Sequence, residues 1–156
     1  MKIEIGSYRV RISFSFNKLV SVEGINSSIG DKHILLWDFD GIENDTQFYK
    51  MCDNLRTVQH HFSLPKIHII QSSKSHYHAY CFFLQDIANT MFVMSKTQGI
   101  DWTFFKLGVI RGYWTLRITP KKQDEKFEYV RCLPSFFSED VECFEALNVV
   151  KYVTGV

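Results

Sequence analysis

The sequence predicts an α+β fold in which a mixed or antiparallel sheet carries helices packed on one face. Short apolar runs bounded by Gly, Pro and polar clusters are typical of strands, and two stretches with apolar residues three and four apart favour helices. These elements follow the order strand, helix, strand pair, helix, strand, with no internal repeat or low-complexity linker. The chain has 156 residues, about the size of one domain, so we expect residues 1–156 to form a single domain.

The composition is typical of a globular protein, with 46% hydrophobic and 15% aromatic residues against 22% charged. The 18 basic and 17 acidic residues give a net charge of 18 − 17 = +1, which neither supports nor excludes nucleic acid as a partner. The four cysteines have no metal-ligand spacing, which indicates reduced thiols. No apolar run reaches the roughly 20 residues that cross a bilayer. We therefore expect a cytoplasmic protein, in the host cytoplasm if a plasmid or virus encodes it, with no membrane partner.

The first half of the chain is expected to begin with strands. Polar and apolar residues alternate within 3–16, with a break at Gly6, which predicts one or two strands. Residues 26–31 are expected to form a loop. The run 33-HILLWDFD-40 is too short for an independent helix. Its Ile, Leu and Trp content, bounded by Gly41, predicts a strand that passes through the core.

Two helices are expected after this strand. The first begins at Asn44, which with Gln47 is placed like a capping box, and it ends before Pro65. One face of this helix carries apolar residues three and four positions apart: Phe48, Met51, Cys52, Leu55, Val58 and Phe62. The second helix is expected to follow the cap residue Asp86 and to end near Gly99.

The remaining elements are assigned from β-propensity, turn residues and apolar spacing. In chain order they are a hairpin of strands 66–71 and 76–83 around the polar loop 72–75, a strand over 113–119, a charged turn at 121–126, a strand over 127–133, and a closing helix over 137–150 with Ser138 as its N-cap. Gly155 is expected to leave the end of the chain loose.

Two acidic residues stand at the end of the first buried strand. Side chains two apart share one face of a strand, so Asp38 and Asp40 are expected to lie together while Trp37 and Phe39 face the other side. Neighbouring carboxylates repel unless a cation lies between them or one is protonated, and hard ions such as Mg²⁺ prefer oxygen ligands. The pattern predicts a Mg²⁺ or Mn²⁺ site. In an alternative interpretation the strand ends at Trp37 and both aspartates lie in a solvated turn.

A second polar cluster lies in 72-SSKSHYHAYCF-82. His76 and His78 share one strand face, and the loop before them offers hydroxyls, a lysine and backbone amides, which together could cradle a phosphate. Two imidazoles on one face could instead bind a metal directly. A third interpretation makes them exposed histidines of a hairpin.

A third cluster lies in 115-TLRITPKK-122, where Arg117 and Thr119 share a strand face and Lys121 and Lys122 follow. These cations could reach phosphates from the surface of a sheet. A strand with one outward arginine is ordinary when taken alone, so only the combination of the three clusters is informative.

In this order the stretches 36-LWDFD-40, 73-SKSHYH-78 and 116-LRITPK-121 resemble the three motifs of the archaeo-eukaryotic primase superfamily. That family has an acidic hydrophobic-Asp-hydrophobic-Asp strand, a small-residue loop leading into a histidine, and a third strand motif. The resemblance implies an RRM-like palm that joins nucleotides in DNA replication, using two metal ions. It also implies a single-stranded DNA template, nucleoside triphosphates, and a helicase or accessory primase subunit as partners.

The resemblance assigns roles to individual residues. It implies that Asp38 and Asp40 bind the metal ions and that His78 joins them in catalysis. Contacts to the triphosphate and its developing charge are expected from the loop and the third strand: Ser73, Lys74, Ser75, His78, Arg117 and Lys121. The family's third motif usually carries another acidic residue, but 113–119 contains none. Asp101 and Asp124 are the candidates to replace it.

Two other functions fit parts of the sequence. The segment 76-HYH-78 alone resembles the HUH endonucleases, in which two histidines bind a metal and a tyrosine attacks a DNA phosphodiester, and Tyr152 would be that nucleophile. A non-catalytic RRM-like module would instead stack single-stranded bases on aromatic residues such as Tyr77, Tyr113 or Trp114.

Overall fold

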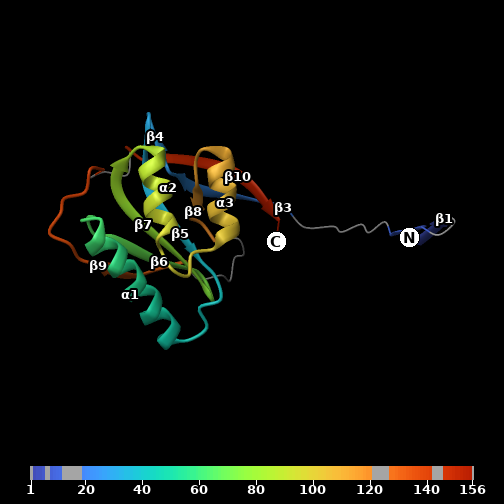
Figure 1. Ribbon diagram of the computed structural model, residues 1–156, viewed down its shortest axis with the longest axis horizontal. Helices are drawn as coiled ribbons and strands as arrows, with labels where there is room; N and C mark the ends of the chain where they lie inside the picture. The colour runs from blue at the N-terminus through green and yellow to red at the C-terminus, as the bar shows by residue number, and fades with distance from the viewer. Residues whose placement is uncertain (1, 6–7, 12–18, 121–126, 142–145, 156) are drawn as a thin grey trace.

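The computed structural model describes residues 2–5, 8–11, 19–120, 127–141 and 146–155 (Figure 1). The expected α+β fold is confirmed, and its two larger sheets are antiparallel. The five-stranded sheet has the order β4 (Ser28–Ile29), β5 (Lys32–Phe39), β7 (His76–Gln85), β6 (Ile67–Ser73) and β9 (Glu128–Leu133). The three-stranded sheet has the order β10 (Asn148–Gly155), β3 (Leu19–Asn26) and β8 (Thr115–Arg117).

The first two strands, β1 (Lys2–Ile5) and β2 (Tyr8–Arg11), form a hairpin and pair only with each other among the described strands. The predicted break at Gly6 therefore separates two strands. The last part of the expected strand region, residues 12–16, lies outside the described residues.

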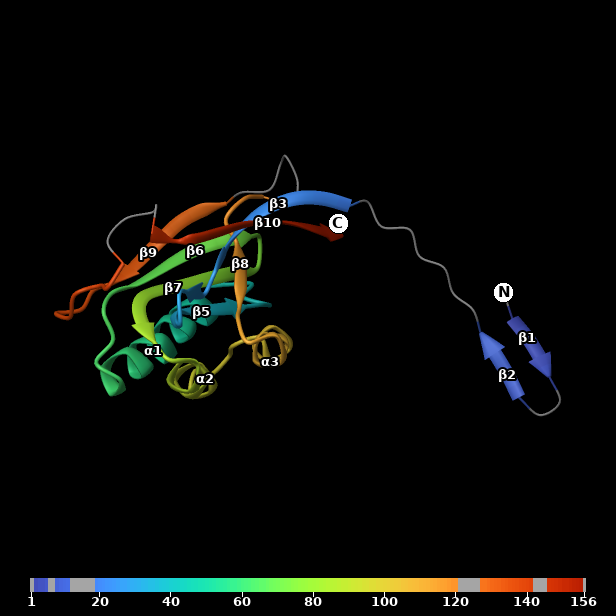
Figure 2. The ribbon, with the colours of Figure 1, turned by 90° about the horizontal axis from the view of Figure 1, so that it is seen from above.

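The larger sheet is built as a split β-α-β unit. Strands β5 and β6 are joined by helix α1 (Asp45–His61) and both pair with β7, which lies between them. Helices α2 (Ile87–Ser95) and α3 (Trp102–Arg111) follow β7. All three helices lie on the same side of this sheet, and β3 and β10 lie on the other side (Figure 2). The predicted helix-covered face is thus confirmed, and the opposite face carries β3 and β10.

Strand β5 passes through the core because its apolar side chains meet neighbours on both faces. Ile34, Leu35, Leu36 and Trp37 are fully buried. The indole Nε1 of Trp37 donates a hydrogen bond of 2.8 Å to Thr97, just after α2. Alternation along the strand then turns the next side chain, Asp38, away from the helices.

The predicted starts of the first two helices are confirmed. The side chain of Asn44 accepts a hydrogen bond of 3.0 Å from the backbone N–H of Gln47, and the Gln47 side chain accepts one of 2.7 Å from the N–H of Glu43. Asp86 caps α2 in the same way, through the N–H of Asn89. None of the helices in the described ranges has both the length and the apolarity needed to span a bilayer.

The predicted closing helix over 137–150 is wrong. Residues 137–141 follow an irregular path, residues 142–145 lie outside the described residues, and Asn148–Gly155 form β10, which pairs with the whole of β3. The segment is rich in β-branched valine, which suits a strand, and its partner lies far away in the sequence. Gly155, expected to be loose, pairs with Leu19 at the end of this ladder.

Helix α3 and strand β3 are elements that the sequence patterns did not predict. Asp101 caps α3 by accepting a hydrogen bond of 2.7 Å from the N–H of Thr103, and Gly112 ends it with a positive φ of 80°. Within α3, Gly108 lies so close to Trp114 that an added Cβ would be 1.9 Å from its Nε1. Three of the four cysteines, Cys52, Cys81 and Cys132, are free thiols as expected, while Cys143 lies outside the described residues.

Candidate active site

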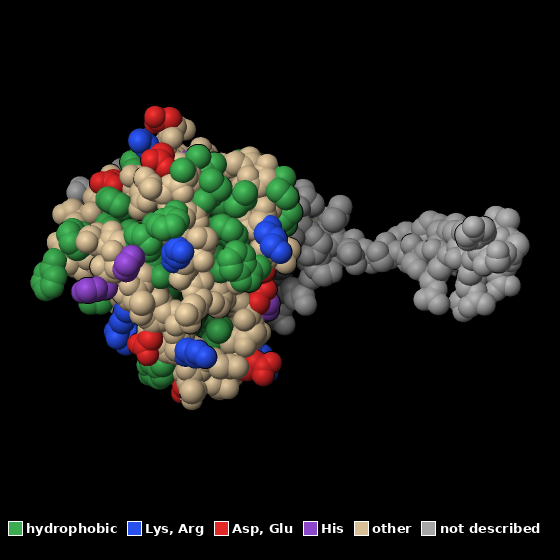
Figure 3. Space-filling view, viewed as in Figure 1, with side chains coloured by type: hydrophobic (Ala, Val, Ile, Leu, Met, Phe, Trp, Pro, Cys, Tyr) green, Lys and Arg blue, Asp and Glu red, His purple; other side chains and the backbone are tan. Residues whose placement is uncertain are grey.

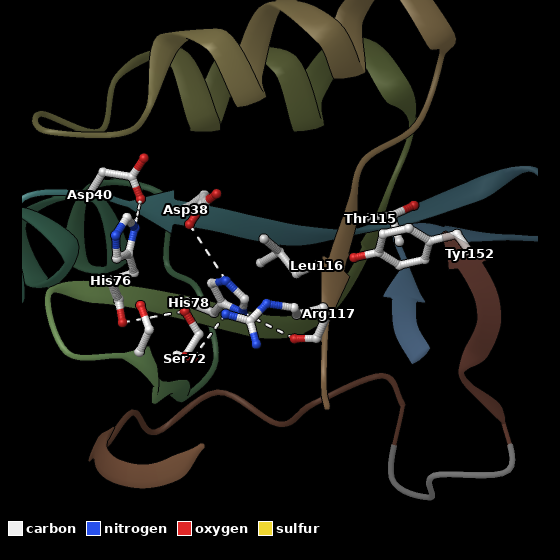
Figure 4. A pocket seen from close by; sticks show the side chains of 10 residues that line it. Asp38, Asp40, Ser72, His76, His78, Thr115, Leu116, Arg117 and Tyr152 are labelled. Atoms are coloured by element: carbon white, nitrogen blue, oxygen red, sulfur yellow. Dashed lines mark hydrogen bonds and ion pairs between the residues drawn. The ribbon is translucent and has the colours of Figure 1, made fainter. Parts of the chain in front are cut away.

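A pocket of about 330 Å³ opens on the sheet face opposite the helices, between the five-stranded sheet and strands β8 and β10 (Figure 4). It collects polar side chains that are far apart in the sequence. Its lining residues are Asp38, Asp40, Ser72, Ser73, His76, His78, Thr115, Leu116, Arg117 and Tyr152. The three sequence clusters that carried the functional prediction all contribute to it.

Strand register brings the first two clusters together. Asp38 of β5 is the direct partner of His78 of β7, and on the other side of β7 His76 is paired with Ser73 of β6. Directly paired residues point to the same face of a sheet, with their Cβ atoms about 5 Å apart. The hairpin between β6 and β7 thus places both histidines beside the acidic end of β5.

Asp38 lies in β5, and its side chain is 22% exposed. Burial raises the pKa of this carboxyl to about 7, and the negative charges of Asp40 and Asp101 add to the effect, while His76 and Arg117 oppose it. Because β5 continues to Phe39, the alternative in which the strand ends at Trp37 is wrong. A neighbouring cation therefore stabilises the ionised form of this buried carboxyl group more strongly than that of an exposed one.

Asp40 follows directly after β5 and is more exposed, with 49% of its side chain accessible. Its carboxylate is hydrogen-bonded to Nδ1 of His76, and this interaction is drawn in Figure 4. The two aspartates therefore reach the pocket from one strand end but in different surroundings, one mostly buried and one open to solvent.

His78 is 5% exposed, and its hydrogen bonds determine which ring nitrogen carries the proton. Nδ1 lies 3.1 Å from the carbonyl oxygen of Arg117, which can only accept, so Nδ1 carries the proton. Nε2 then faces the pocket, 3.6 Å from Oδ1 of Asp38. The ring is held rigidly, with one nitrogen directed at the space where a ligand would lie.

Arg117 places a positive charge in the wall of the pocket and is 7% exposed. Its guanidinium donates hydrogen bonds of 2.9 Å to the carbonyl oxygens of Thr119 and Ser72 and lies 5.9 Å from the ring centre of Phe127. A guanidinium fixed in this way is suited to binding phosphate. The sequence predicted Arg117 at a sheet surface, whereas the structure buries it.

The phosphate-binding loop is only partly as expected. Ser73 lines the pocket, and so does Ser72, which the sequence did not single out. Lys74 and Ser75 form the turn beyond and are not lining residues; the carbonyl of Ser75 accepts a hydrogen bond of 3.0 Å from Ile42. Lys121 lies outside the described residues.

Tyr152 forms the far wall of the pocket from strand β10 rather than following a helix. Its ring lies against β3 at Gly24, where an added Cβ would be 2.9 Å from Cε1 of the tyrosine. Burial raises the pKa of the Tyr152 hydroxyl, and Asp38 adds to this while Arg117 opposes it. The tyrosine therefore lines the same pocket as both histidines, at the end away from His76 (Figure 4), and burial favours its neutral phenol form.

Of the candidate third acidic residues, Asp101 is next to the site and Asp124 lies outside the described residues. The N–H of Asp101 donates a hydrogen bond of 2.8 Å to the carbonyl of Asp38, while its side chain caps α3. Across the described ranges, no three His, Cys, Asp or Glu side chains come together in a metal-binding arrangement. Magnesium often takes only one or two protein carboxylates and completes its shell with water and substrate phosphates, so the donors present fit such an ion.

The aromatic residues proposed for base stacking do not form one surface. Tyr77 lies on the helix side, with its ring centre 5.1 Å from that of Phe48 in α1. Trp114 is buried, and its Nε1 donates a hydrogen bond of 3.1 Å to the carbonyl of Phe105. Tyr113 is 40% exposed, next to the end of α3.

The chain was compared with family models, with curated proteins and with solved structures. None of these comparisons found a match.

Proposed function

We propose that this chain is a metal-dependent nucleotidyltransferase of the primase-polymerase type, which joins nucleoside triphosphates on a single-stranded DNA template. One observation carries the proposal: strand register places Asp38 opposite His78, and the buried Arg117 of a different sheet lies in the same pocket. Carboxylates that can hold a metal ion and a fixed cation recur in phosphoryl-transfer sites, and an imidazole can act there as an acid, a base or a phosphate ligand.

The metal ion proposed for this pocket is Mg²⁺ or Mn²⁺, with Asp38 and Asp40 as its protein ligands. The donor chemistry supports the assignment, since two hard oxygen donors face one space and burial disfavours the ionised form of Asp38 in the absence of a cation. When bound, such an ion would supply positive charge to the phosphate oxygens and the leaving group. Asp101, whose negative charge helps to raise the pKa of Asp38, is the candidate for a third acidic ligand.

The protein's own groups would bind the triphosphate on the opposite side of the pocket. His78, Ser72 and the guanidinium of Arg117 lie close together there (Figure 4), and Ser73 also lines the pocket. Arg117 would neutralise phosphate charge, and Nε2 of His78 faces the same pocket, where it would take up a proton and then donate a hydrogen bond to a phosphate oxygen. We include a helicase or accessory primase subunit among the proposed partners, because a domain with a net charge of +1 has little general attraction for DNA.

The proposal is tested by incubating the protein with a primed single-stranded template, labelled nucleotides and Mn²⁺. Asp38→Asn and Asp40→Asn should each abolish metal-dependent incorporation while the variants stay folded by circular dichroism. Asp53→Asn is the matched control, since Asp53 is a 74% exposed carboxylate on α1, remote from the pocket. Incorporation that persists in both site variants would falsify the proposal.

A second function is favoured by one observation: Tyr152 lines the same pocket as His76 and His78. An HUH-type endonuclease needs two histidines on a metal and a tyrosine that attacks the DNA backbone. Against it, burial raises the pKa of the Tyr152 hydroxyl and disfavours the phenolate. Incubation with labelled single-stranded DNA separates the two, because nicking would leave a covalent protein-DNA adduct that Tyr152→Phe abolishes.

A further inference from the structure

A row of rings, most of them partly buried, leads away from the candidate active site along the pocket side of the five-stranded sheet. The ring centre of Phe127 lies 6.2 Å from that of His78. Further along, the ring of His68 lies 6.0 Å from Tyr129 and 5.5 Å from Phe82. We call Phe127, Tyr129, His68 and Phe82 the aromatic row.

Strand register shows that the aromatic row and the pocket share one face. Ile70 of β6 is paired with His78 on one side and with Tyr129 on the other, so all three side chains point the same way. His68 is two positions before Ile70 on β6 and therefore shares this face. Tyr129 lies on the edge strand β9 and is 56% exposed, so its ring is accessible from solvent.

We propose that the aromatic row is a track for single-stranded DNA, which carries the template into the pocket. The proposal deepens the function proposed above, since it names the surface that the template occupies. Every base has a π-face, so exposed rings along a sheet bind single strands without sequence preference, whereas the bases of a duplex are already stacked. Continuity with the pocket through Phe127 and His78 favours this occupant over an unrelated ligand.

Charged side chains lie at both ends of the aromatic row. At the pocket end, the guanidinium of Arg117 lies 5.9 Å from the ring centre of Phe127 and makes this end positive. At the other end, Glu139 is hydrogen-bonded to Nε2 of His68 and paired with Lys66 at 2.8 Å. Because carboxylates repel phosphates, the track is expected to run from Phe127 over Tyr129 and to end near His68.

The test measures binding of a short fluorescent oligothymidylate to the full chain in EDTA, without nucleotides. Tyr129→Leu should weaken binding by roughly 5- to 150-fold, the range for one stacked base. Tyr129→Phe keeps the ring and loses only the hydroxyl that contacts Nδ1 of His68, so its affinity should stay near that of the wild type. Tyr49→Leu is the matched control, since Tyr49 is 55% exposed on α1, on the opposite side of the sheet.

The track proposal would be overturned if Tyr129→Leu and Tyr49→Leu bound oligothymidylate with equal affinity. It would also be overturned if the wild type bound duplex DNA as tightly as the single strand. The result is independent of the catalytic proposal. Asp38→Asn should bind oligothymidylate normally while it loses incorporation. Tyr129-dependent binding in a protein that never incorporates nucleotides would leave the track standing and reject the catalytic function.

Discussion

Burial and the neighbouring charge of Asp40 raise the pKa of the Asp38 carboxyl to about 7, far above the value of 3.8 that an exposed aspartate has. An acid with a raised pKa in the folded state binds its proton more tightly there than in the unfolded chain. The folded state is therefore favoured at low pH, and this contribution is lost as the pH rises from about 4 to about 7. Asp38 destabilises the protein under the conditions in which it would bind a cation.

The first prediction follows from the direction of this pH dependence. Asp38→Asn should raise the melting temperature at pH 8 by several degrees, because it removes a carboxylate that is ionised and poorly solvated there. Near pH 4.5, where the folded wild type is protonated at this position, the two proteins should melt at similar temperatures. Thermal melts at the two pH values check this, and a pH-independent difference between the proteins would contradict it.

The second prediction concerns the cation itself. Mn²⁺ or Mg²⁺ should raise the melting temperature of the wild type at pH 8 and should have little effect on the double variant Asp38→Asn, Asp40→Asn. Because the ion binds the ionised carboxylate, its affinity should increase as the pH rises through about 7, with release of a proton. Calorimetry in buffers of different ionisation enthalpy measures that proton, and binding that is independent of pH would argue against Asp38 as a ligand.

At the level of elements, α3 is held against the core by a contact that only glycine allows. Gly108 lies against the indole of Trp114, whose Nε1 donates a hydrogen bond to the carbonyl of Phe105 one turn earlier. An added methyl group would overlap with the indole, and neither the helix backbone nor the buried ring can move far.

The third prediction is that Gly108→Ala lowers the free energy of unfolding by about 1–3 kcal/mol, in spite of the better helix propensity of alanine. Chemical denaturation followed by tryptophan fluorescence measures this change. Lys106→Ala on the exposed side of the same helix is the control and should be nearly neutral. A stabilised Gly108→Ala variant would show that α3 does not pack on Trp114 in this way.

How far the sequence predicted these elements depended on how local their causes are. Helices α1 and α2 were predicted because Asn44 and Asp86 cap them within one turn. Strand β10 was predicted as a helix because its partner β3 is more than a hundred residues away, and apolar spacing alone cannot reveal such pairing. Helix α3 was missed because exposed apolar residues on several sides, including Ile110, obscure its period.

The candidate site was also predicted only in part. The facing positions of Asp38 and His78 were implied by motifs that lie on adjacent strands, and the structure pairs these residues directly. The lining of the phosphate loop was not predictable, because the register of β6 and β7 shifts between Gln71 and Ser73. Such an irregularity changes which side chains face the pocket, and here Ser72 and Ser73 do so while Lys74 does not.

On the scale of the whole molecule, the helix layer and the pocket lie on opposite faces of the sheet. The helix-covered face presents many apolar side chains to solvent (Figure 3), among them Phe92, Trp102 and Ile110, the last of which is 81% exposed. Exposed apolar patches of this kind promote association with other molecules.

The fourth prediction is that Ile110→Lys reduces light scattering and self-association at high protein concentration. The same variant should incorporate nucleotides and bind oligothymidylate like the wild type, because α3 and the pocket are separated by the sheet (Figure 2). Loss of either activity in a folded variant would mean that the two faces are not independent.

The two faces do meet at one point, where the N–H of Asp101 donates a hydrogen bond to the carbonyl of Asp38. This bond uses only main-chain atoms, so every substitution at position 101 except proline leaves its donor in place. The first turn of α3 thus anchors the strand end that carries the carboxylate. A ligand that displaced α3 along its axis would shift the main chain of Asp38 through this bond, whatever side chain occupied position 101.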